Sequence, residues 1–215
     1  MPGIRLGCSF LPSLPGYTVP LTFPSVTGMK LMAVKFLKNF VLCAGAALEI
    51  EDRSIIEAGR ARGKPGGLLR SPQERFYQYV VWKATHAKWD VEVEKDAHDL
   101  VILNPYDNRK YLCVFEMKNW FSENGMREVR PIKNDIDVKL KNCDSPNSAF
   151  ILFSANPRGA MDEQLRWLED RIFDSSPPSR ETYCFTTVSP HSPSVECEFW
   201  IAGWPIKSGP IFSNL

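Results

Sequence analysis

Two charged residues interrupt an otherwise apolar segment of this chain and restrict the structures that the segment can adopt. Residues 111–120 read YLCVFEMKNW, and Glu116 and Lys118 are the charged members. The apolar and aromatic residues around them predict a buried strand, yet a charged side chain is seldom buried unless it is paired or coordinates something. Side chains two positions apart share one face of a strand. Glu116 and Lys118 are therefore expected to face the same partner, whereas Met117 points to the opposite side, into the core.

Two segments that precede this one also predict strands. Residues 89–95 (WDVEVEK) alternate strictly and predict a strand with one solvated face, and residues 98–105 (HDLVILNP) are more uniformly apolar. The sequence NPYDN at 104–108 is typical of a hairpin turn. We therefore expect the second and third strands to pair as an antiparallel hairpin.

Pairing through this turn would bring Asp99 and Glu116 side by side. A symmetric register about residue 107 would place Asp99 opposite Phe115, so the pairing requires a bulge or a shift of one residue. Two adjacent carboxylates repel each other and raise each other's pKa. A divalent cation removes that repulsion and uses the oxygens as hard ligands, and a neighbouring lysine can orient a metal-activated water or stabilise charge on phosphorus.

Two helices are expected before this hairpin in the chain. One covers residues 32–60, with a polar break near Glu51–Arg53. A second begins at Ser71, which forms a candidate capping box with Glu74 because the two lie three residues apart. The apolar stripe of the second helix comprises Phe76, Val80 and Ala84, and is widened by Tyr77 and Val81.

The second half of the chain continues the alternation of helices and strands. Residues 130–142 fit both a helix and a strand, and Pro131 near the start and the density of charge favour a helix. A buried strand is expected at 149–155, an amphipathic helix at 160–172 and two strands at 181–188 and 196–204. This order predicts the α/β fold class, with a mixed central sheet flanked by helices.

The organisation of the chain is expected to change twice. Residues 1–28 contain five prolines without a clear period and predict an extended or disordered tail. Met29 and Met32 are candidates for the first residue of the protein, and the sequence alone does not decide between these and Met1. Residues 29–70 predict a helical segment and a basic loop, and residues 71–215 the α/β domain.

Composition excludes several classes of protein. The net charge of +1 means that any nucleic-acid binding must come from local patches. None of the six cysteines has zinc-like spacing, and Cys113 and Cys184 sit in apolar strand-like runs, so we expect buried free thiols in a reducing, cytoplasmic setting. No apolar run reaches membrane-spanning length, and Lys35 and Lys38 make residues 29–48 an amphipathic helix rather than a signal peptide.

The spacing of Asp99 and Glu116-Met117-Lys118 resembles the signature of the PD-(D/E)xK nuclease superfamily, which has the restriction-endonuclease-like fold. Glu74 matches an acidic residue that many members carry on the helix before the first strand. The αβββαβ order over about residues 72–155 also matches the family core. His98 stands where the family name has proline.

The resemblance implies a Mg²⁺- or Mn²⁺-dependent nuclease, an endonuclease acting on DNA, with RNA not excluded. Asp99, Glu116 and the Met117 carbonyl would bind the metal, Glu74 would be an auxiliary ligand, and Lys118 would assist the attacking water. No membrane partner is expected, and a homodimer is left open. The alternative is a catalytically inactive nuclease-like module that binds DNA or a protein partner.

Simpler interpretations of these residues stay open at this stage. Glu116 and Lys118 could be an exposed pair on an edge strand, Glu74 a capping residue, Asp99 a turn residue and His98 a solvated histidine. A second [DE]xK sequence, Asp137-Val138-Lys139, lies in the charged probable helix and has no Asp at suitable spacing before it.

Charge is segregated along the chain in a way that suits a phosphate backbone. Residues 53–88 hold eight Lys or Arg against two acids, and residues 89–116 hold seven acids against three bases. A basic flank beside an acidic notch is what a nucleic acid approaching a metal site needs; the alternative is a solvated helix and loop. The candidate nucleic-acid-binding residues are Arg60, Arg62, Lys64, Arg70 and Arg75.

Overall fold

The structure of this protein is a computed structural model. It describes residues 26–64, 66–70, 73–121, 125–157, 159–189 and 196–209. Most of the expected N-terminal tail, residues 1–25, lies outside the described residues.

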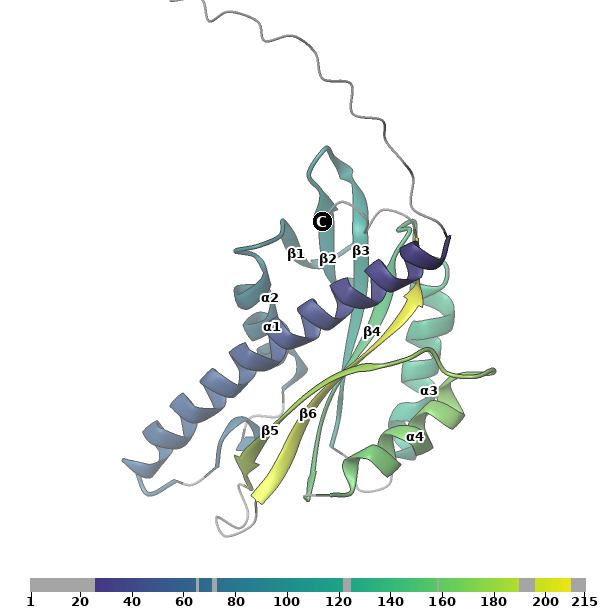
Figure 1. The fold of residues 1–215 in the computed structure, drawn as a ribbon. Helices are drawn as coiled ribbons and strands as arrows, with labels where there is room; N and C mark the ends of the chain where they lie inside the picture. The colour runs from purple at the N-terminus through teal and green to yellow at the C-terminus, as the bar shows by residue number, and fades with distance from the viewer. Residues whose placement is uncertain are drawn as a thin grey trace, which may run out of the picture.

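A six-stranded mixed sheet forms the centre of the molecule (Figure 1). Its order is β1-β2-β3-β4-β6-β5; β3 and β4 are parallel, and all other neighbours are antiparallel. The strands are β1 (Val91–Lys95), β2 (His98–Asn104), β3 (Asp107–Trp120), β4 (Ser148–Pro157), β5 (Glu181–Val188) and β6 (Glu196–Lys207). The predicted α/β class with a mixed sheet is confirmed.

Helices cover both faces of this sheet. The long α1 (Val26–Arg60) crosses one face diagonally, and α2 (Glu74–Thr85) lies beside it (Figure 1). On the opposite face lie α3 (Met126–Asn134), the π-helical turn η2 (Asp135–Leu140) and α4 (Met161–Ile172). A short 3₁₀ turn, η1 (Leu68–Arg70), connects α1 to α2.

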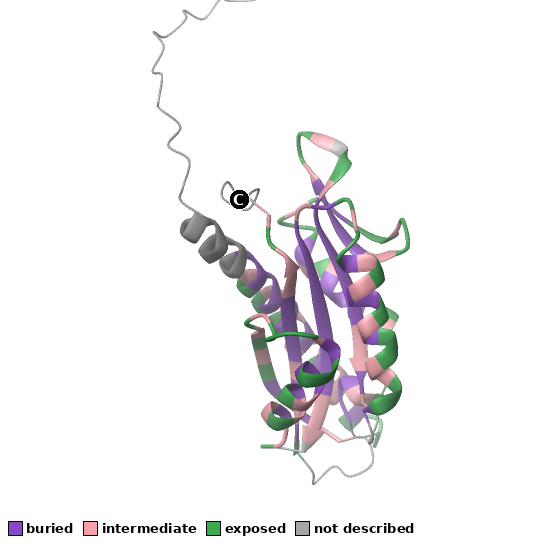
Figure 2. Ribbon diagram, turned by 90° about the vertical axis from the view of Figure 1, so that its right-hand side faces the viewer, coloured by how far each residue is buried: buried purple, intermediate pink, exposed green. Residues whose placement is uncertain are grey.

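Two apolar clusters hold the layers together, one on each face of the sheet. Figure 2 shows that the central strands are buried along most of their length. Phe40 of α1 stacks on Phe115 of β3 in the first, with ring centroids 4.2 Å apart. In the second, Leu165 of α4 and Ile136 of η2 belong to one buried cluster with Phe150 of β4. Since α1 shares its cluster with the strands, the expected segments 29–70 and 71–215 contribute to one core.

The predicted break in the first helix at Glu51–Arg53 is wrong, because α1 is continuous. Asp52 is 1 % exposed, and its Oδ1 accepts hydrogen bonds at 2.7 Å from both Leu68 N and Thr187 Oγ1. Arg53 pairs with Glu49 one turn earlier. The polar residues therefore satisfy one another or tie α1 to the rest of the fold, and they do not interrupt the helix.

The start of α2 differs from the one that the sequence predicted. Gln73 is the N-cap residue and makes no side-chain capping bond, so Glu74 is the first residue of the helix and its carboxylate is directed elsewhere. Ser71 lies outside the described residues. The buried face of α2 centres on Tyr77 and Val81, while Phe76 and Ala84 are half-buried at its margin.

Two further expectations are corrected or resolved by tertiary context. The strict alternation of residues 89–95 does not produce alternating burial, because Val93 in β1 is 44 % exposed at the edge of the sheet. Residues 130–142 are helical, as favoured, but the helix begins earlier, at Met126, and Pro131 lies inside it. It then widens into the π-helical turn η2.

The structure can be compared with the composition-based expectations for the cysteines and for membrane-spanning helices. The five described cysteines, Cys43, Cys113, Cys143, Cys184 and Cys197, are free. Cys113 is buried as predicted, whereas Cys184 is exposed. Among the described residues, none of the helices combines the length and the apolar character needed to cross a membrane.

Candidate functional site

The register of β2 and β3 brings Asp99 next to Glu116. Leu100 pairs with Phe115, so the preceding residue, Asp99, aligns with the following one, Glu116. The ladder shifts at Leu103, between this pair and the turn. The shift that the sequence required is therefore present. Asp99 reaches across the ladder, where its Oδ2 accepts a hydrogen bond of 2.6 Å from Met117 N.

Glu116 and Lys118 share one face of β3, as predicted. This face lies against η2. Met117 is buried in the opposite cluster, beneath α1. Trp120, in phase with Glu116 and Lys118, packs in the cluster formed with α3, η2 and α4. The interpretation of Glu116 and Lys118 as an exposed edge pair is wrong, because β3 is a central strand and the Glu116 side chain is 0 % exposed.

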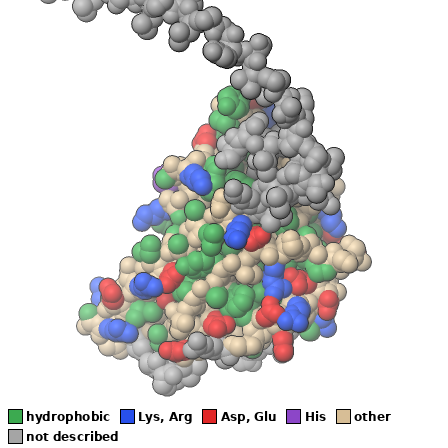
Figure 3. All heavy atoms as spheres, in the orientation of Figure 1, with side chains coloured by type: hydrophobic (Ala, Val, Ile, Leu, Met, Phe, Trp, Pro, Cys, Tyr) green, Lys and Arg blue, Asp and Glu red, His purple; other side chains and the backbone are tan. Residues whose placement is uncertain are grey.

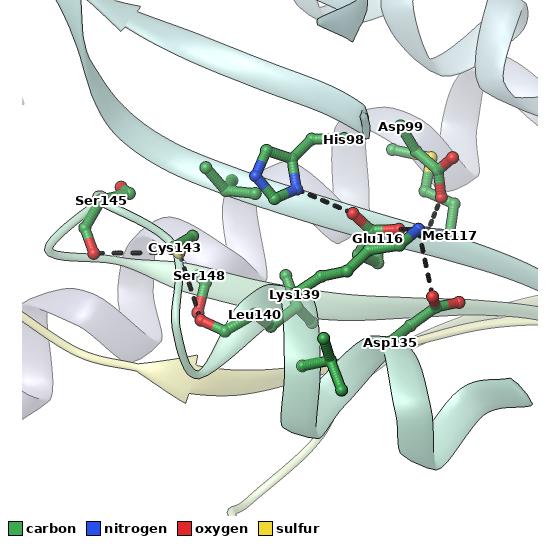
Figure 4. Close-up of polar contacts among 12 residues, drawn as sticks. His98, Asp99, Glu116, Met117, Asp135, Lys139, Leu140, Cys143, Ser145 and Ser148 are labelled. Carbon is green, nitrogen blue, oxygen red and sulfur yellow. Dashed lines mark hydrogen bonds and ion pairs between the residues drawn. The ribbon is translucent and has the colours of Figure 1, made fainter. Parts of the chain in front are cut away.

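Glu116 is held between a histidine and a lysine (Figure 4). His98 Nδ1 lies 2.8 Å from Oε1, and Lys139 Nζ lies 2.8 Å from Oε2. Burial raises the pKa of the Glu116 carboxyl, the bonds to Lys139 and His98 oppose this rise, and the nearby Asp99 charge adds to it. The interpretation of His98 as a solvated residue is wrong, since its side chain is 13 % exposed and contacts Glu116.

Lys118 lies between two other carboxylates. Its Nζ is 3.3 Å from Glu74 Oε1 and 3.4 Å from Asp135 Oδ2. The other oxygen of Glu74 accepts a 3.2 Å hydrogen bond from Asn119 N. Although burial disfavours the charged ammonium, the charges of Glu74, Asp135 and Asp99 outweigh it and raise the pKa of Lys118. Glu74 therefore belongs to the cluster through Lys118.

Sequence reasoning missed two members of the cluster, Asp135 and Lys139, both on η2. Asp135 is buried, and Lys139 Nζ lies 3.1 Å from its Oδ1. The residues are four apart on one helical segment, a spacing that places side chains on the same face and that could have been noticed. Asp137, the acid of the second [DE]xK sequence, instead pairs with Lys141 at 2.6 Å.

The five basic residues expected to bind nucleic acid are exposed, but the described contacts connect none of them to the carboxylate cluster. Arg70 Nη1 donates a 3.0 Å hydrogen bond to Lys64 O, and Arg75 lies 3.3 Å from Glu94. Arg60 and Arg62 are exposed at and beyond the end of α1. On the face that α1 covers, basic side chains are interspersed with acidic and apolar ones (Figure 3). The basic flank stays a prediction.

Carboxylates are the groups that the site could offer to a cation. Among the described residues, no group of three or more His, Cys, Asp or Glu side chains is arranged to hold a metal ion. Asp99, Glu116 and Asp135 nevertheless supply carboxylate oxygens, the ligands that Mg²⁺ prefers. The Lys139 ammonium, which is positively charged like a metal ion, lies between Glu116 and Asp135.

Comparison with protein-family models, with curated proteins and with solved structures found no match.

Proposed function

We propose that this protein is a Mg²⁺- or Mn²⁺-dependent nuclease that hydrolyses phosphodiester bonds of DNA, and that it acts as an endonuclease. The observation that carries the proposal is the meeting of Asp99, Glu116, Lys118 and Glu74 at one place. These residues come from α2, β2 and β3, and they are the four side chains that the resemblance to the PD-(D/E)xK superfamily selects. An accidental match of the sequence pattern would not require them to converge.

The topology around the site supports the same proposal. The helix α2 is followed by the antiparallel strands β1, β2 and β3, then by α3 and η2, and then by β4 parallel to β3. This order agrees with the αβββαβ order expected of a restriction-endonuclease-like core and so supports the proposal. In that reading the central strand β3 carries the acid and the lysine on one face.

Each residue has a distinct role in this proposal. Asp99, Glu116 and the carbonyl of Met117 would hold the metal, which offsets negative charge at the scissile phosphate. Lys118 would position the attacking water or balance charge at phosphorus, because its ammonium lies among the carboxylates of the site. Glu74 is a positioning residue, because it holds Lys118 and the backbone of Asn119.

A second candidate function is a catalytically inactive module that binds DNA or a protein partner. One observation favours it: both oxygens of Glu116 are already bound, by His98 and by Lys139. If these contacts persist in every state of the protein, Glu116 has no oxygen available for a metal.

Cleavage of supercoiled plasmid separates the two functions. With Mn²⁺ or Mg²⁺ the wild type is expected to nick DNA, and EDTA is expected to stop the reaction. Glu116→Gln and Glu116→Ala should abolish nicking, and Lys118→Met should slow it by about two orders of magnitude, the usual cost of losing one charge-stabilising group. Lys141→Met, in the exposed pair with Asp137, is the matched control.

The assay has clear adverse outcomes. Equal nicking by wild type and Glu116→Gln would remove the assigned site. No nicking of plasmid or of a structured RNA by wild type, together with no heat of Ca²⁺ or Mn²⁺ binding that depends on Asp99, would favour the inactive module.

A further inference from the structure

The two helices that cover one face of the sheet leave an apolar groove between them. Ala47 and Ile50 of α1 and Phe76, Tyr79 and Val80 of α2 line this groove, and its volume is about 260 Å³. Ile50 is 65 % exposed and Tyr79 is 54 % exposed. Single exposed apolar residues are common on protein surfaces, whereas an aromatic and a branched aliphatic side chain beside one hollow are typical of an interaction surface.

The apolar surface continues from the groove along α1. Leu42, about two turns before Ile50, is 41 % exposed, and Ala46 between them is exposed as well. Leu42, Ala46 and Ile50 follow one another at intervals of four residues and therefore share one face of the helix, the α1 stripe. Figure 3 shows apolar side chains along the middle of the face that α1 covers. The groove and the α1 stripe together offer a larger surface than the groove alone, as a stable interface requires.

One acidic and one basic side chain line the groove from its two walls. Glu51 belongs to α1 and Lys83 to α2. Within the part of the chain that the structure describes, neither forms an ion pair, whereas Arg53, close to Glu51 on α1, pairs with Glu49. A two-fold axis brings the same surface of two subunits face to face, so that every contact between two different residues occurs twice. Opposite charges on the two walls make this surface complementary to itself.

We propose that the groove between α1 and α2 is a homodimer interface, and that its occupant is the same surface of a second copy of this chain. Ile50 and Tyr79 supply the apolar contact at its centre. Glu51 pairs with the partner's Lys83 at two positions related by the two-fold axis. This inference does not depend on the proposed nuclease activity, because Glu116 and Lys118 face η2 on the other side of the sheet.

Exchange of the two charges tests the pairing. Sedimentation equilibrium of the full chain measures the Kd of dimerisation for wild type, Glu51→Lys, Lys83→Glu and the double exchange. Each single exchange replaces two attractive contacts by two repulsive ones, so dimerisation should weaken by about tenfold or more. The double exchange restores opposite charges and should return the Kd to within about threefold of wild type. Glu57→Lys, an exposed change on α1 outside the groove, is the matched control and should leave the Kd unchanged.

Two further measurements examine the apolar contact and the identity of the partner. Tyr79→Asp should weaken dimerisation by about tenfold or more, because aromatic side chains at the centre of an interface carry much of its binding energy. Tyr79 is exposed in the single chain, so the variant should keep the wild-type circular dichroism spectrum. Carbodiimide cross-linking of mixed unlabelled and ¹⁵N-labelled protein should join Glu51 of one isotopic form to Lys83 of the other.

The outcomes decide between a second copy and any other occupant. A wild type that stays monomeric up to about 1 mM would overturn the proposal and leave the groove to residues 1–25 of the same chain or to a different protein. A dimer whose Kd is unchanged by the single exchanges and by Tyr79→Asp would refute it too, and so would a double exchange that fails to restore the Kd or cross-links confined to one isotopic form. Weakening by each single exchange with recovery in the double exchange supports the inference, whether or not the protein cuts DNA.

Discussion

Removing the Lys139 charge should destabilise the metal-free protein, by an amount that follows from the burial of its partner. Glu116 is fully buried and in Lys139→Met keeps only His98. Breaking a buried ion pair from one side costs about 3–5 kcal/mol. Because Lys139 itself is one-third exposed and His98 remains, we expect a loss of about 2 kcal/mol. For a chain of this size that corresponds to a fall in Tm of about 4–8 °C.

The loss should depend on pH in a defined direction. Burial raises the pKa of Glu116 in the folded protein, and removal of Lys139 raises it further. A carboxyl whose pKa is higher in the folded than in the unfolded protein binds a proton more readily when folded. Its charge therefore lowers stability in full above the folded pKa, and this cost declines as the pH falls from the folded toward the unfolded pKa. The defect of Lys139→Met should therefore be largest near pH 7 and shrink as the pH falls through the raised pKa of Glu116.

Urea denaturation in EDTA at several pH values measures this effect. A double-mutant cycle with Glu116→Gln isolates the interaction, and Lys141→Met, which removes an exposed pair, should cost no more than about 0.5 kcal/mol. If Lys139→Met and Glu116→Gln are additive within about 0.5 kcal/mol, or if the defect does not change with pH, the two groups are not coupled and the reasoning is wrong.

Two structural carboxylates outside the site give further predictions. Asp52→Ala should lower the free energy of unfolding in urea by about 2 kcal/mol, because it leaves the buried Leu68 N–H without an acceptor. Burial raises the pKa of Asp52, so the stability of the wild type should rise relative to that of Asp52→Asn as the pH falls. A stability difference that does not change with pH would contradict this. Arg180→Met should cost about 3 kcal/mol because Glu169 stays buried without its cation. A loss no greater than that of Arg166→Met, in an exposed pair, would refute it.

Local patterns in the sequence were enough to predict the order of helices and strands and the faces of β3. Period-two spacing placed Glu116 and Lys118 on one face of a strand and Met117 on the other, because side-chain direction in a strand is a local property. The short turn after Asn104 and the requirement for a shift placed Asp99 beside Glu116. The helix over residues 130–142 followed from its density of charge, whereas its start at Met126 did not follow from Pro131.

Only the tertiary structure decided what these groups contact. The sequence indicated that Glu116 needed a partner, but His98 and Lys139 were selected by the way β2 and η2 pack against β3. In the same way, the sequence around Asp52 predicted a helix break, whereas in the structure Asp52 accepts hydrogen bonds from Leu68 and Thr187 and the helix continues. The physical reason is common to both cases. Spacing along the chain specifies the direction of a side chain, whereas the partner of a buried charge is set by which distant segments meet at that side chain.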